Sequence, residues 1–415
     1  MALLSRYRML DLSRLMAGPY ASHILADMGM QVIKIEEPEP RYGMARDSLT
    51  PYLPTPEGER HASAYNFLAR NKRSIVIDLL RPELRPRSQE VFYRLAKEAD
   101  VVLDGYRPGV LEWMGIDYET LSKINPRIIV CSLSGYGQDG PYARLAGHGG
   151  QYASVGGVTR MNEAGEAQDG TGGHAGVVNA LYAANAILAA IVEREESGRG
   201  QYIDVSMLGA LMSLNVRESV EWARDGKLPA PRPSGTTGNG ASLSYIRCKD
   251  GKYISTANAE TKFWENFCNL LDRPQYIPLG RGSGPEYDAM VEDVRAIFLT
   301  KTREEWLPML WEAETCAAPV NSIADALQDP QVRHVGMAWD LEHPSEGTVQ
   351  QLGFAARFSR TPVAFERFAP ILGEHTHEVL TEAGFDAAEI ADLEAAGIVK
   401  SWTGEGWVGE TRPPA

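Results

Sequence analysis

The sequence predicts an α/β fold built on an open, parallel, Rossmann-like sheet, and three observations support this prediction. A strand, a helix and a second strand follow one another between Arg8 and Glu37. Further apolar strands are expected at 74–78, 101–104 and 128–133, with helical patterns between them. The 415 residues are enough for two domains and a large core. In such a sheet, ligands bind beyond the carboxyl ends of the strands.

The first strand–helix–strand unit shows the pattern most clearly. Residues 9–12 form a short apolar run, and Pro19 fits the first helical turn, where its missing N–H would be unpaired. Apolar residues then recur at helical spacing until Gly29 closes the helix. Residues 32–35 form the second apolar run.

The loop 13–19 lies at the carboxyl end of the first strand. Ala17 and Gly18 would let a ligand approach the backbone, and the following helix N-terminus favours an anion. An ordinary turn between strand and helix is the alternative interpretation.

The composition indicates which kinds of partner and which cellular compartment to expect. The formal net charge of −14 argues against nucleic acid or a membrane surface as a partner. The N-terminus lacks the apolar core of a signal peptide, and the apolar run 177–192 is shorter than the ~20 residues of a membrane span, so we expect a buried helix. Four widely spaced cysteines indicate reduced thiols in the cytoplasm rather than disulfides or a metal site: Cys131, Cys248, Cys268 and Cys316.

The rest of the chain is expected to form a second domain and a linker. We expect a large α/β domain over 1–205, a linker helix over 206–230 and a small α+β domain over 231–330. Lys249-Asp250-Gly251, between two short strands, predicts a hairpin with an Asp-Gly turn. Helical segments are expected at 89–99, 111–121, 263–271, 290–298, 303–314 with a kink at Pro308, and 322–327.

The run LDLSRLMAGPYASHILADMGMQVIKIE, residues 10–36, resembles the N-terminal signature of the family III CoA-transferases. No single piece is specific, but further short segments resemble the family in the same order over nearly the whole chain: 71–74, 107–109, 125–127, 134–137, 197–201, 318–320, 329–331 and 372–375. The resemblance implies that residues 331–415 return to the large domain and that two subunits interlock as a dimer. It also implies coenzyme A or acyl-CoA as substrate.

The resemblance further implies a CoA site at the strand ends. Arg107 would pair with a phosphate, and Tyr106 would lie against the adenine ring. For 71–73 a solvated turn is the alternative, for Arg107 a plain surface arginine, and for 134–137 a strand-end turn. The residues implied in binding are Arg14, Leu15, Ala17, Asn71, Lys72, Arg73, Gly105, Tyr106, Arg107, Gly135 and Tyr136.

The nucleophile of the family is absent from its expected place. The resemblance implies an aspartate that attacks the acyl-CoA thioester, at the start of the helix that leads to the 197–200 turn. Counting back from that turn, the position falls on Ala175 or Gly176, and neither carries a carboxylate. Asp169 is the nearest replacement in the chain and would require a register shift.

Two further residues resemble family acid–base groups. His148 resembles the base of the racemases, whose second base is the missing aspartate, and Glu260 resembles a supporting glutamate. For His174 we expect only a hydrogen-bonded buried group. Glu37 and Trp113 stand where the family commonly has arginine, which would weaken the binding of a polyanion.

These departures favour one hypothesis over two others. The chain would be the aspartate-lacking subunit of a two-gene CoA-transferase, paired with a paralogous catalytic subunit, with succinyl-CoA as donor and a dicarboxylic acid such as 2-benzylsuccinate as acceptor. The first alternative is a self-sufficient acyl-CoA racemase, isomerase or lyase that uses His148 with Glu260 or Asp169 and pairs with itself as a homodimer. The second is a non-enzymatic CoA-binding scaffold.

Overall fold

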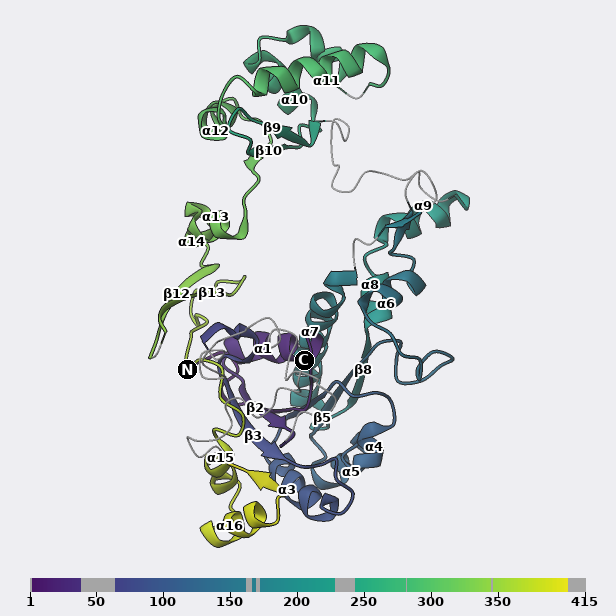
Figure 1. Cartoon of the computed structure of the whole chain (residues 1–415). Coiled ribbons are helices and arrows are strands. Elements are labelled where there is room, and N and C mark those ends of the chain that lie inside the picture. Colours follow the sequence, from purple (N-terminus) through teal and green to yellow (C-terminus); the bar gives the residue numbers. More distant parts are fainter. Residues whose placement is uncertain are drawn as a thin grey trace, which may run out of the picture. The chain divides into compact units, whose positions relative to one another are not determined.

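The computed structural model describes residues 2–38, 64–161, 166–168, 172–227, 243–280, 282–344 and 346–401. The chain divides into two compact units, which Figure 1 shows in sequence colours. The larger unit combines Met1–Leu228 with Arg333–Ala415, and the smaller unit is Pro229–Val332.

A seven-stranded sheet forms the centre of the larger unit, in the order β14-β3-β2-β1-β4-β5-β8. All neighbouring strands run parallel except β14, which is antiparallel to β3. The order changes direction between β1 and β4, and an open sheet binds its ligands beyond the strand ends at such a point. The strands are β1 Arg8–Asp11, β2 Gln31–Glu36, β3 Lys72–Ile77, β4 Val101–Asp104, β5 Ile129–Ser134, β8 Tyr202–Ser206 and β14 Val399–Lys400. The predicted open α/β sheet is confirmed.

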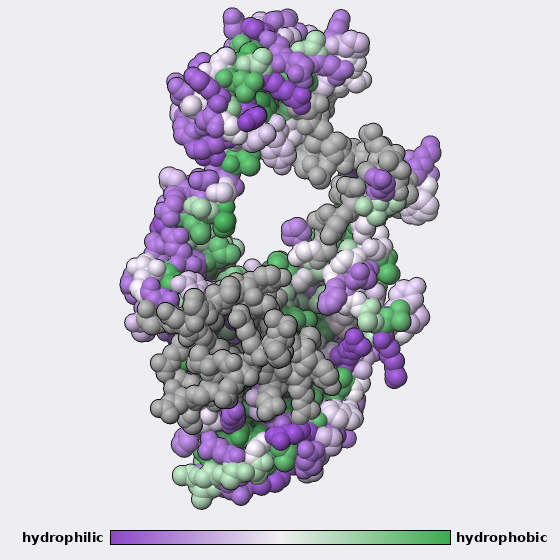
Figure 2. Space-filling model, viewed as in Figure 1, coloured by the Kyte–Doolittle hydropathy of each residue, from purple (hydrophilic) through white to green (hydrophobic). Residues whose placement is uncertain are grey.

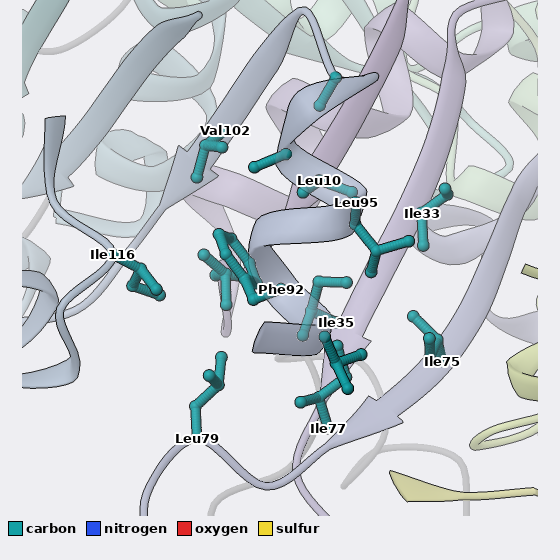
Figure 3. Packing of buried hydrophobic residues seen from close by; sticks show 14 of the residues in the cluster. Leu10, Ile33, Ile35, Ile75, Ile77, Leu79, Phe92, Leu95, Val102 and Ile116 are labelled. Carbon is teal, nitrogen blue, oxygen red and sulfur yellow. The ribbon is translucent and has the colours of Figure 1, made fainter. Parts of the chain in front are cut away.

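Successive strand residues supply two separate cores, because side chains alternate between the faces of a sheet. Leu10 and Ile33 belong to one buried cluster, while Met9 and Val32 belong to another. Figure 3 shows Phe92 of α3 among the branched side chains of the first cluster. The helices that contribute to it are α3 Arg85–Lys97, α4 Val110–Met114, α5 Tyr118–Ile124, α15 Thr376–Glu382 and α16 Ala387–Ala395.

The single helical segment expected over 111–121 is wrong in one respect. Gly115 adopts a left-handed conformation, with φ of 70°, and ends α4 before α5 begins. Apolar spacing continues across this break, and so spacing alone did not reveal it.

Helices α1 Ala17–Asp27 and α7 Ala175–Ser197 supply the second core. Among the described residues, α7 is the one helix long and apolar enough to cross a membrane by length and composition, and 44% of its most apolar window is buried inside the protein. Ala183 and Ile187 of α7 are buried in the same cluster as the strand residues. This is the position of a core helix.

The remaining parts of the larger unit are short. In place of the single linker helix expected over 206–230, the structure has α8 Met207–Met212 and α9 Val216–Asp225. After residue 333 the chain forms the β12–β13 hairpin and then returns to the large sheet through β14. The other elements are η3 Phe67–Ala69, α6 Gly149–Val155, β6 Arg160–Met161, β7 Ala167–Gln168, η4 Gly172–His174, α14 Pro330–His334, β12 Ala338–His343 and β13 Gly347–Leu352.

The smaller unit packs helices on a three-stranded sheet of order β11-β10-β9. Tyr253 pairs with Arg247 across the predicted hairpin, and Gly251 in its turn has φ of 80°, a conformation that favours glycine. Stacked rings of Phe267, Phe298 and Trp306 fill the core. The elements are β9 Tyr245–Arg247, β10 Tyr253–Thr256, α10 Thr261–Leu270, η6 Pro274–Leu279, α11 Pro285–Phe298, α12 Arg303–Glu312 with Pro308 inside it, β11 Ala317–Pro319 and α13 Ile323–Gln328.

Candidate functional site at the strand ends

A buried ionic network anchors the loop after β1. The Asp11 carboxylate is fully buried and accepts hydrogen bonds from the Ser13 backbone N–H at 2.8 Å and the Ser22 hydroxyl at 2.5 Å. Lys34 Nζ lies 3.3 Å and Lys72 Nζ 3.5 Å from its two oxygens. Burial raises the pKa of the Asp11 carboxyl, but the charges of Lys34 and Lys72, together with the hydrogen bonds from Ser13 and Ser22, hold this pKa well below its usual range. The carboxylate is therefore ionised and fixes the loop from below.

Sequence analysis did not identify this network, although a signal was present. Asp11 ends an apolar strand, and Lys34 interrupts the apolar run of β2. A charged side chain on an otherwise apolar strand needs a buried partner, since an isolated buried charge is costly.

The loop above the network has an unusual backbone. Leu15 adopts a left-handed conformation with φ of 65°, which is uncommon for a residue with a branched side chain, and its side chain is exposed. Gly18 has a different role from the one expected, because a Cβ there would lie 2.0 Å from Ser13 Cβ. Gly18 thus admits the Ser13 side chain rather than a ligand, and Ala17 is buried.

The loops after β1 and β4 meet at the point where the strand order reverses. A Cβ on Gly105 would contact the Ser13 Cα at 3.4 Å. Arg14 and Tyr106, predicted binding residues from these two loops, are in contact, because the guanidinium carbon lies 4.4 Å from the ring centroid. Arg14 also pairs with Glu37 at 3.0 Å.

Asp104, at the end of β4, is a buried acid below this contact. Its carboxyl accepts a hydrogen bond from the Tyr106 backbone N–H at 2.7 Å. Burial raises the pKa of Asp104 to about 7, against the opposing effect of hydrogen bonds from Tyr106 and Ser132. The candidate site therefore contains a carboxyl group that titrates near neutral pH, which sequence analysis did not single out.

The side chains of Asn71, Lys72 and Arg73 are all engaged within the protein. Lys72 is 1% exposed and donates to the Ser22 hydroxyl and to the Pro19 carbonyl. Asn71, at φ of 60°, bonds to Asp27 and to backbone groups of residues 364–367. Arg73 pairs with Glu378 and Glu382. A CoA contact by this tract stays a prediction, and these side chains would have to exchange internal partners to make it.

Tyr152 of α6 covers the turn after β5. A Cβ on Gly135 would lie 2.4 Å from the Tyr152 ring, and Tyr136 packs edge-on against the same ring with centroids 4.8 Å apart. Arg107, on the neighbouring strand-end loop, is exposed. Gly135 therefore has a packing reason to be glycine, and Arg107 is accessible to a ligand.

The start of α7 brings the expected nucleophile position to the β1 loop. Ala175 is buried, and a Cβ on Gly176 would lie 2.6 Å from Met16 Cγ. Gly176 therefore faces the loop after β1, but the Met16 side chain fills the space beside it. Asp169, the replacement considered above, lies outside the described residues.

Three further candidates are exposed. His148 precedes α6, where its backbone N–H donates to the Gln151 side chain at 2.9 Å, and its side chain is exposed. The expectation of a buried His174 is wrong, since this residue is exposed at the start of α7. Glu260 is exposed before α10 in the smaller unit.

Trp113 is half-exposed, and the Arg85 guanidinium carbon lies 3.6 Å from its ring centroid. Among the residues with described positions, no group of three or more His, Cys, Asp or Glu could hold a metal ion.

Comparison with known proteins agrees with this arrangement. The model of CoA-transferase family III matches residues 4–376. The chain is similar to a succinate–glutarate CoA-transferase of Agrobacterium fabrum, with 34% identity over 91% of this chain and 95% of that protein. It is also similar to the beta subunit of a succinyl-CoA–L-malate CoA-transferase of Chloroflexus aurantiacus, with 30% identity over 95% of this chain and 98% of the subunit.

A solved structure extends the comparison to the fold. A CAIB/BAIF family protein from Brucella suis superimposes with a TM-score of 0.76 at 28% identity, covering 91% of this chain and 98% of that protein. The match of the family model over most of the sequence, together with the strand-end site and the shared fold, shows that the chain belongs to CoA-transferase family III.

Proposed function

We propose that this chain is the subunit without the nucleophilic aspartate in a two-chain CoA-transferase. The enzyme would move CoA from succinyl-CoA to a dicarboxylic acid such as 2-benzylsuccinate. One observation carries the proposal: at the start of α7, where the family places its aspartate, Ala175 is buried and Gly176 is closed off by Met16. Neither position offers a carboxylate to attack a thioester.

The partner would supply the covalent chemistry. Its aspartate attacks the thioester carbonyl and expels CoA thiolate, giving an acyl–aspartyl anhydride. The thiolate then attacks the aspartyl carbonyl, which releases the acyl group as a free carboxylate and leaves an aspartyl-CoA thioester. Attack by the acceptor carboxylate and return of the thiolate complete the transfer and regenerate the aspartate. This chain would complete the interlocked dimer.

Exposed apolar side chains support the need for a partner. Helix α9 has no buried residue in the described structure, although it carries valine and tryptophan side chains. Figure 2 shows hydrophobic residues at the surface of the larger unit near α6 and α8. Where such side chains gather into one exposed patch, they mark an interaction site. Exposed apolar residues on helices α6 to α9 include Val155 of α6, Leu181, Tyr182 and Val192 of α7, Met212 of α8, and Val216, Val220 and Trp222 of α9.

The donor and the two-subunit organisation rest on similarity. Both curated relatives described above are named for succinate or succinyl-CoA, and one of them is a beta subunit. The acceptors in their names are glutarate and L-malate, which are dicarboxylic acids like 2-benzylsuccinate. A dicarboxylate acceptor is therefore the shared element.

Co-expression tests the proposal. The chain is produced alone and with a neighbouring family III paralogue, and CoA transfer from succinyl-CoA is measured with glutarate, L-malate and 2-benzylsuccinate. We expect activity only from the pair, and loss of it when the partner's aspartate is replaced. Transfer by this chain alone would contradict the proposal.

The alternatives give different results in the same preparation. A racemase would exchange the α-proton of an acyl-CoA with solvent in the isolated chain, and His148→Ala would abolish that exchange. A scaffold would assemble with the paralogue without increasing its activity.

A further inference from the structure

Three side chains from three different strand-end loops contact one another at the edge of the sheet where CoA is predicted to bind. Arg14 follows β1, Glu37 follows β2 and Tyr106 follows β4. Arg14 Nη1 lies 3.0 Å from Glu37 Oε1, and the Tyr106 hydroxyl donates to the same oxygen at 3.2 Å. The Arg14 side chain is 29% exposed and that of Glu37 15% exposed, so the cluster is partly shielded from water.

Within this cluster, Arg14 and Tyr106 already use the groups with which they would bind a nucleotide. A guanidinium pairs with a carboxylate in the same forked manner as with a phosphate. The Arg14 guanidinium covers one face of the Tyr106 ring, against which an adenine is predicted to lie. A nucleotide must therefore compete with Glu37 for the charge of Arg14 and displace Arg14 from the ring.

The surrounding charges increase this competition. Asp104 is buried below the cluster, and its carboxyl interacts with both Arg14 and Glu112. The Glu37 side chain occupies the position beside Arg14 that a phosphate would approach. Arg107 is exposed on the same loop as Tyr106 and remains available to a phosphate.

We propose that Glu37 is a specificity-determining residue that acts as an internal competitor and keeps the affinity of this edge for CoA low. The inference rests on the proposed function, since CoA is taken as the ligand of this edge. It explains how a subunit of a CoA-transferase can keep the fold of the binding edge and leave the binding of CoA to its partner. The same contacts hold the β1 and β4 loops together without a ligand.

A CoA titration of the full chain tests the inference. Binding is measured by isothermal titration calorimetry for the wild type, Glu37→Gln and Glu119→Gln. Glu119 is an exposed acid on helix α5, so its replacement makes the same charge change on another element. We expect Glu37→Gln to tighten CoA binding about tenfold or more, because a charge-assisted contact to Arg14 is lost. We expect Glu119→Gln to change it less than about twofold, because only a screened charge is lost.

Two further variants separate the contact from the charge. Glu37→Asp keeps the charge on a shorter side chain, and we expect an intermediate gain in affinity because the hydrogen bonds to Arg14 and Tyr106 lengthen. Adding Arg14→Ala to Glu37→Gln should remove the gain, since Arg14 is the group released. Circular dichroism verifies that each variant is folded.

Equal effects of Glu37→Gln and Glu119→Gln would overturn the inference, as would weaker binding in Glu37→Gln. Absence of CoA binding in every variant would also overturn it. Transfer by the co-expressed pair is measured separately, so that a failure of this inference is distinguishable from a failure of the proposed function.

Discussion

Nζ of Lys34 lies 3.3 Å from Oδ1 of Asp11, and their side chains are only 9% and 0% exposed. Lys72 approaches the other oxygen of the same carboxylate. The buried Asp11 carboxylate thus faces two buried lysines at the end of β1, next to the loop 13–19 that was predicted to bind a ligand.

Replacement of Asp11 by asparagine should therefore be strongly destabilising. Asp11→Asn keeps the shape but removes the negative charge that faces Lys34 and Lys72, and breaking such a buried ion pair costs about 3–5 kcal/mol. The free energy of unfolding in urea measures this cost. The exposed pair of Arg87 and Asp392 provides the control, because Asp392→Asn should cost less than about 1 kcal/mol. Similar costs for the two variants would show that the Asp11 network is not a stability element.

Asp104 should make stability fall as pH rises. Its folded-state pKa of about 7, raised by burial, lies above the ordinary value of 3.8. Its contribution is therefore fully present below about pH 4 and is lost as pH rises through about 7. Compared with Asp104→Asn, the wild type should lose up to ~1.4 kcal/mol per pH unit in this window. Urea midpoints at pH 5 and pH 8 measure the difference, and parallel pH profiles would contradict the assignment.

His23 should act in the opposite direction. Burial, and then the charges of Arg70 and Lys72, hold the pKa of His23 well below 6.5. The unfolded chain therefore takes up a proton below about pH 6.5 that the folded chain does not, so stability is lost as pH falls through this value. His23→Gln should flatten the decline in unfolding free energy between pH 7 and pH 5. An unchanged decline would place the responsible group elsewhere.

Gly176 should not tolerate a side chain while Met16 is present. A Cβ at this position would lie 2.6 Å from Met16 Cγ, and overpacking of this kind typically costs about 1–3 kcal/mol. Gly176→Ala should lower the thermal unfolding midpoint, and adding Met16→Ala should relieve the clash so that the two effects are not additive. A double-mutant cycle measures the coupling, and simple additivity would show that the two residues are not in contact.

Sequence periodicity predicted the sheet because strand and helix patterns are local. The predicted β1, β2, β4 and β5 lie within one or two residues of the observed strands, since an apolar run between polar turns fixes a buried strand. The break at Gly115 was not predicted, because apolar spacing continues across it and the left-handed conformation leaves no mark in the spacing. The Asp-Gly hairpin was predicted, because the turn chemistry is local to five residues.

The site was less predictable, because its contacts join distant segments. The sequence placed Arg14 and Tyr106 at strand ends and identified Glu37 as unusual, but it did not show that these three side chains bind one another. Gly18 and Gly135 were assigned to the ligand, whereas Ser13 and Tyr152 fill the space beside them. A glycine in the sequence does not show whether a ligand or a neighbouring side chain fills the space that a Cβ would take.

The sequence by itself determined the open parallel sheet, the place of the loop 13–19 at the end of β1 and the absence of a carboxylate at Ala175 and Gly176. These follow from local apolar patterns and from residue identity, which do not depend on distant contacts. Only the tertiary structure decided that Lys72 is buried against Asp11 and that Arg14 is paired with Glu37. The physical reason is that a charge at a strand end can pair with any residue that the sheet order brings beside it. That order places β3, β2, β1 and β4 next to one another although they are far apart in the chain.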